Sequence, residues 1–145
     1  MTDNERRLNT IIYIISLCLS SSRFSRGLPP FDFESVSTAE FMMARSLPFI
    51  KNGGENYETA HKSFLMDMFG NGWTYGSEDF AARTHPDLVE YNELPQESKE
   101  MIAFTAALVC SAQEFYKNLK TELEEEILDS FNKSAAFIVG AGVTH

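Results

Sequence analysis

The longest stretch of this chain without a helix breaker lies between Pro95 and Gly140, where neither glycine nor proline occurs. Its apolar residues recur at helical spacing, first as a broad face and then, from Leu119 onward, as a narrower stripe. Pro95 suits the first turn of a helix, because that turn leaves its backbone N–H groups unbonded in any case. We therefore predict one long helix, or two in succession, and a mainly α fold.

Three more helices are predicted upstream. They are expected over about residues 4–20, from about residue 37 onward and over about 56–69, where apolar residues are spaced by three and four. Because residues 11–15 are rich in β-branched isoleucine, a strand is the competing interpretation there. The length of the periodic run favours the helix.

The second of these helices has predicted boundaries. Ser37 and Glu40 match a capping box, in which the two side chains bond to exposed backbone N–H groups of the first turn. Pro48 is expected to kink or end the helix. Residues 20–33, with their serines and prolines, are predicted to form a loop before it, which either covers a pocket or is a solvated connector.

Two short alternating segments are predicted to be strands. Residues 73–75 and 88–91 alternate between apolar and polar side chains, as strands do. The segment between them, 76–86, is too long for a tight turn. The predicted fold is a helical bundle with a small antiparallel β-hairpin.

The same region contains a recognisable set of motifs. His61 and Phe64 precede Gly72-Trp73-Thr74-Tyr75-Gly76, and the run from His85-Pro86 to Leu94-Pro95 follows. Over this span the chain resembles the ryanodine receptor repeat (RyR) domain family. Phe64 stands where that family usually has tryptophan. The resemblance implies a single repeat-like domain over residues 1–145, with a C-terminal helical extension over about 119–145.

Composition narrows the classes of partner. The 145 residues are 43% hydrophobic and 23% charged, as in an ordinary globular protein of one domain. The net charge of −9 would repel a phosphate backbone, so binding to a nucleic acid polymer is not expected. A small nucleotide in a local basic pocket remains compatible with this charge.

Cysteine usage and hydropathy indicate a cytoplasmic protein. Cys18 and Cys110 each lie in an apolar helical run and are predicted to be buried free thiols, as in a reducing compartment. The apolar run at residues 11–19 is too short to span a membrane, and acidic residues balance the arginines before it. A core helix is therefore predicted, without contact with a membrane.

No motif for catalysis, a metal or a cofactor is present. The three histidines lack Cys or His neighbours at metal-ligand spacing, and no nucleophile elbow or phosphate-cradling loop occurs. A Cys110 thiol paired with a histidine is conceivable, but an apolar setting would raise its pKa and suppress its reactivity. The chain is predicted not to be an enzyme.

What remains is a set of flat and polar side chains that could bind a ligand. The predicted ligand-binding residues are His61, Phe64, Trp73, Tyr75, Arg83, His85 and Tyr91. Candidate phosphate ligands are Arg23, Arg26, Arg45, Lys62 and Arg83. Structural roles are the alternative for these residues: Trp73 as a core aromatic, His61 as a brace and His85 as part of a turn.

The resemblance adds a specific expectation. RyR repeats resemble modules that bind adenine nucleotides or related molecules, with the aromatic at the Phe64 position stacking on the ligand between paired repeats. Because this chain has one repeat, a paired pocket implies a homo-oligomer. The expected function is non-enzymatic binding of a nucleotide or cyclic oligonucleotide. In a phage, such a protein would act as an anti-defence sponge for an immune signal.

A protein-interaction module is the alternative function. The acidic C-terminal helix and the apolar tail at residues 135–143 would then dock on a partner protein. That tail is expected to pack either on another subunit or on its own domain, because an uncovered apolar segment is a liability.

Overall fold

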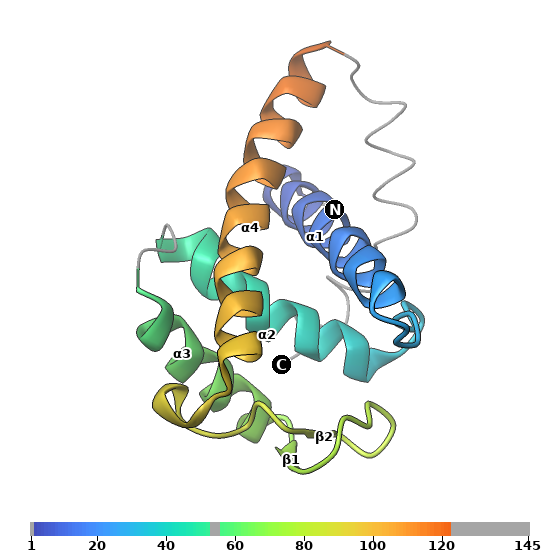
Figure 1. The fold of residues 1–145 in the computed structure, drawn as a ribbon. Coiled ribbons are helices and arrows are strands. Elements are labelled where there is room, and N and C mark those ends of the chain that lie inside the picture. The colour runs from blue at the N-terminus through green and yellow to red at the C-terminus, as the bar shows by residue number, and fades with distance from the viewer. Residues whose placement is uncertain (1, 53–55, 123–145) are drawn as a thin grey trace.

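The computed structural model describes residues 2–52 and 56–122, and within them the fold is mainly α, as predicted (Figure 1). Its elements are the helices α1 (Asp3–Ser25), α2 (Val36–Asn52), α3 (Tyr57–Gly70) and α4 (Gln96–Glu122), the strands β1 (Thr74–Tyr75) and β2 (Thr84–His85), and the 3-10 helix η1 (Tyr91–Glu93). The predicted narrow stripe beyond 122, the C-terminal extension and the apolar tail lie outside the described residues.

Helix α1 is longer than predicted and ends at a glycine. The competing strand interpretation for residues 11–15 is wrong, and the predicted loop starts at Arg26 instead of residue 20. Ser25 donates to the carbonyl of Ser22 at 2.8 Å, so this hydroxyl bonds within the helix instead of breaking it. Gly27, at φ 71°, then allows Leu28 N–H to bond back to Arg23 O at 2.9 Å, which is a Schellman ending.

Helix α2 differs from its prediction at both ends. It begins at Val36, so Ser37 lies inside the first turn instead of at the cap. Pro48 lies within the helix, which continues to Asn52. The prediction that proline ends the helix is therefore wrong. A single proline removes one i to i−4 hydrogen bond, and packing of the helix compensates for that loss.

The two strands pair in parallel, and the predicted antiparallel hairpin is wrong. Thr74 pairs with Thr84 and Tyr75 with His85, whereas residues 88–90 form no strand. The segment between the strands folds back on itself: Asp79 and Thr84 exchange backbone hydrogen bonds of 3.0 and 3.1 Å. Arg83, at φ 57°, then turns the chain so that β2 enters beside β1 in the same direction.

Helix α4 organises the packing. It crosses both α1 and α2, and its later turns extend past the other helices (Figure 1). The core between the helices is apolar and contains Ile12, Met42 and Ile102. Both cysteines are free, but Cys18 is only half-buried and Cys110 is exposed on α4, so the prediction of buried thiols is wrong. Among the described helices, none is long and apolar enough to cross a membrane.

Candidate functional site

The ring of Phe64 is closed off inside the protein. Helix α3 places His61 and Phe64 one turn apart, and their rings stack with centroids 5.4 Å apart. The guanidinium of Arg45 lies over the Phe64 ring, 3.7 Å from its centroid, and Phe41 meets the ring edge-on at 5.8 Å. Only 1% of Phe64 is exposed. The predicted stacking position therefore has no open face in the single chain.

His61 braces this region. Its Nε2 donates to the carbonyl of Val89 at 2.7 Å, so Nδ1 is left to accept from Arg45 Nη1 at 3.0 Å. Burial lowers the pKa of His61, and the nearby Arg45 charge lowers it further, while the bond to Val89 opposes both. The imidazole therefore links α3, α2 and the segment after β2 as a neutral group.

Trp73 and Arg83 share one buried carboxylate. Glu40 Oε1 accepts from Trp73 Nε1 at 3.3 Å and from Arg83 Nε at 2.8 Å. Trp73 is 1% exposed, so its polar edge is satisfied within the core. We call Phe41, His61, Phe64 and Trp73 the aromatic cluster.

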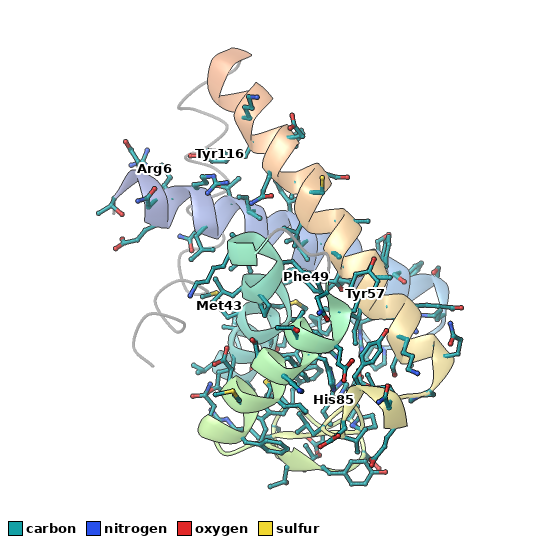
Figure 2. The ribbon with its side chains drawn as sticks, turned by 90° about the vertical axis from the view of Figure 1, so that its left-hand side faces the viewer. Arg6, Met43, Phe49, Tyr57, His85 and Tyr116 are labelled. Carbon is teal, nitrogen blue, oxygen red and sulfur yellow. The ribbon has the colours of Figure 1, made fainter. Side chains whose placement is uncertain are left out.

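The remaining predicted residues lie in separate places. Tyr75 on β1 is 66% exposed. Tyr91 meets His61 edge-on at 6.2 Å and has the Lys99 ammonium 5.2 Å from its centroid. Figure 2 shows His85 at the end of the molecule that carries the strands, away from Arg6 on α1 and Tyr116 on α4. The seven predicted ligand residues therefore do not surround one space.

An open cavity of about 260 Å³ lies beside His85 instead. The C-terminal end of α1, the middle of α2, the segment around β2 and the first turns of α4 form its walls. Its lining includes Arg23, Arg26, Leu28, Phe31, Phe41, Arg45, Glu78, His85, Asp87, Glu97, Ser98 and Met101. We call this cavity the arginine pocket. Three of the predicted phosphate ligands line it, whereas Lys62 and Arg83 do not.

Arg23 is the most firmly bound arginine on the α1 side. Its Nη2 bonds to Glu78 Oε1 at 2.6 Å, its Nε donates to Pro29 O at 2.8 Å, and its guanidinium lies 4.5 Å from the Phe31 centroid. The hydrogen bond with His85 and the ion pair with Arg23 lower the pKa of Glu78 to about 2, although burial acts in the opposite direction.

Arg45 forms the second ion pair of the pocket. Its Nη2 lies 2.7 Å from Asp87 Oδ2, and Ser98 Oγ donates to Asp87 Oδ1 at 2.7 Å. Burial lowers the pKa of Arg45 to about 10, with Asp87 opposing that shift. The guanidinium is therefore still charged at neutral pH, and it joins the arginine pocket to the aromatic cluster.

Arg26 forms the third ion pair, which is open to solvent. Its Nη1 lies 2.8 Å from Glu97 Oε1 on the first turn of α4. The side chains are 35% and 74% exposed. Each arginine of the pocket therefore faces one carboxylate, and the three pairs differ in how deeply they are buried.

The comparison with known families decides what kind of domain this is. The model of the RyR domain matches residues 35–128, which is well over half of the chain. The chain belongs to the RyR domain family. No curated protein and no solved structure matches it. The matched span begins just before α2, so Arg23 of α1 and Arg26, which caps α1, lie outside the part of this RyR domain that the family model matches.

Sequence reasoning missed several groups that line the pocket of this RyR domain. The sequence pattern did not single out Glu78 or Glu97, and it placed Phe31 in a loop. The only signal for them was the pair of arginines in the segment before α2, which could not specify its partners. Over residues 2–52 and 56–122, no three His, Cys, Asp or Glu side chains are grouped as a metal site.

Proposed function

We propose that this protein binds a nucleotide-like small molecule in the arginine pocket and performs no reaction on it. One observation supports this most strongly: arginines from the C-terminal end of α1 and the middle of α2 meet aromatic side chains around one open cavity. Arginine is the side chain best suited to phosphate, and an aromatic ring contributes roughly 1–3 kcal/mol when a base stacks on it.

The aromatic side of the pocket can accept a flat ring. Phe41 and His85 lie with ring centroids 5.0 Å apart, and Phe31 lies 6.3 Å from Phe41. The three rings form one wall, while the arginines come from the C-terminal end of α1 and the middle of α2. Together they offer a base-sized apolar surface beside a phosphate-sized polar one, despite the net charge of −9.

The size of the pocket limits what one chain can hold. Small-molecule sites usually measure roughly 300–1,000 Å³, so a cavity of about 260 Å³ is at the small end. It suits one nucleotide unit, and a cyclic oligonucleotide would extend out of it. We propose that a second copy of the chain covers the rest of such a ligand, which makes the working form a homo-oligomer.

A binding domain without a catalytic constellation acts by holding its ligand. The proposed role is sequestration of a nucleotide or cyclic oligonucleotide signal in the cytoplasm. In a phage this would be an anti-defence sponge, which removes an immune signal before its receptor binds it. The family match supports the domain type, and the pocket supports the class of ligand.

Calorimetry with AMP, adenosine and a cyclic dinucleotide tests this function. The unaltered protein should bind at least one of the phosphate-bearing compounds. Arg26→Gln should weaken that binding at least tenfold, because it removes the arginine most open to solvent. Lys62→Gln removes the same charge outside the pocket and should stay within twofold of the unaltered protein. A folded protein that gives no heat at high micromolar ligand would rule the function out.

A protein-interaction module is the second candidate, and one feature of α4 favours it. Phe104 and Phe115 are both partly exposed and are three helical turns apart, so they lie on one face. In this function a partner protein would cover that face and the chain beyond it. Truncation after Leu119, or Phe104→Ser with Phe115→Ser, should then abolish a pull-down that Arg26→Gln leaves intact.

A further inference from the structure

The three ion pairs of the arginine pocket differ in burial and in their other bonds. This difference determines which class of ligand the pocket can take. A phosphate that enters must take an arginine from its carboxylate. How readily each arginine can be released depends on the burial of the pair and on the other bonds that hold it.

Two of the pairs are not available for exchange. Arg45 and Asp87 have side-chain exposures of 7% and 14%, and His61 and Ser98 hold them further. Arg23 is 9% exposed and its partner Glu78 33%, and Pro29 O fixes the Arg23 Nε. Removing the carboxylate from either arginine would leave a buried charge without its partner, which is strongly unfavourable.

The third pair can exchange at little cost. Beyond Glu97, Arg26 has one long contact, from Nε to Ser22 O at 3.4 Å. Both side chains reach solvent, where an ion pair contributes little net stability. Glu97 lies in the first turn of α4, so its charge stays favourably placed near the helix N-terminus after Arg26 is lost.

We propose that Glu97 occupies the phosphate position of the empty pocket and is displaced when the ligand binds. This inference rests on the proposed function and makes it more specific. Because only one arginine can exchange its partner, the pocket takes a ligand with a single phosphate or phosphodiester group at Arg26. Further phosphates of a di- or triphosphate find no second free arginine in the pocket.

Charge-neutral substitution of Glu97 tests the displacement. Glu97→Gln should tighten AMP binding about two- to fivefold, which is the range expected for an exposed ion pair. Adenosine binding should not change, because adenosine has no phosphate to compete with Glu97. ATP should bind no tighter than AMP. Glu100→Gln, which removes an exposed carboxylate on the same helix outside the pocket, is the matched control and should behave as the unaltered protein.

Failure of this inference can be separated from failure of the proposed function. If AMP binds but Glu97→Gln leaves its affinity unchanged, or changes adenosine equally, the displacement is wrong and the binding function stands. If no nucleotide binds, the function fails, and inorganic phosphate then tests Arg26 directly. NMR signals of the Arg26 side chain that shift at a phosphate concentration about two- to fivefold lower in Glu97→Gln than in Glu100→Gln support the displacement. Equal concentrations in the two variants overturn it.

Discussion

The aromatic cluster and the arginine pocket lie side by side and share Phe41, yet they are organised in opposite ways. In the cluster, the rings of Phe64 and Trp73 are sealed, and each polar atom of His61 and Trp73 has a protein partner. In the pocket, the polar groups border an open cavity, and one arginine reaches solvent. The packing of the aromatic cluster therefore holds Phe41 and Arg45 in place where they line the arginine pocket.

This contrast separates the scaffold of this RyR domain from the pocket for which we propose ligand binding. Six of the motif residues in the region His61–Pro95 are buried, and three of them lie in the aromatic cluster; the six are His61, Phe64, Trp73, His85, Leu88 and Leu94. Two arginines of the pocket come from the C-terminal end of α1 and its cap, outside the span that the family model matches. Arg45 connects the regions, because it covers Phe64 on one side and pairs with Asp87 on the other.

Loss of the Arg45 partner should have the largest effect. Asp87→Ala leaves the Arg45 charge buried and uncompensated, which typically costs about 3–5 kcal/mol of unfolding free energy. Urea denaturation measures this. Glu97→Ala removes the carboxylate from the exposed Arg26 and should cost at most about 1 kcal/mol. Equal losses in the two variants would mean that the pairs do not differ in burial as described.

Enlarging the sealed ring should have a smaller effect. Phe64→Trp restores the residue typical of the family, but the structure has no free space around this ring. We expect a loss of about 1–3 kcal/mol from overpacking and no gain in nucleotide affinity. Thermal unfolding and calorimetry measure the two quantities. Tyr75→Trp, at an exposed position, is the control and should change neither. Tighter nucleotide binding by Phe64→Trp would show that the aromatic cluster opens.

The smallest effect should be on the pH dependence of the unfolding free energy. The folded-state pKa of Glu78 is lowered from 4.5 to about 2, so its ion pair contributes stability above pH 4.5 that is lost as the pH falls toward 2. Glu78→Gln should therefore narrow the difference in unfolding free energy between pH 5 and pH 3. Glu93→Gln, at an exposed position in η1, should keep the slope of the unaltered protein. Identical slopes in all three proteins would contradict the shift.

The sequence predicted the features of the fold that depend only on residues close together along the chain. Helical spacing predicted α3 to within a residue at each end and placed His61 beside Phe64, because the helical repeat alone fixes that neighbour. The strand direction could not be predicted in this way, since it depends on the backbone of Arg83 and on the Asp79–Thr84 pairing.

The arginine pocket was harder still to predict, because it is formed by residues that are distant in sequence. Arg26 and Glu97 are 71 residues apart, and no local pattern joins them. Similarly, spacing placed Phe64 among flat side chains but could not reveal that Arg45 covers it. Residue types could therefore suggest a phosphate-binding arginine, whereas only the folded chain specifies which arginine is exchangeable.

Helix α4 extends from the arginine pocket to the opposite end of the described structure. Glu97 and Ser98 lie on its first turn, and the same unbroken helix of 27 residues continues to Glu122, about 40 Å away. Because α4 packs against α1 and α2, it connects the two ends of the molecule as one rigid element. If the proposed change of partner at Glu97 tilted the first turn, the opposite end of the helix would move with it.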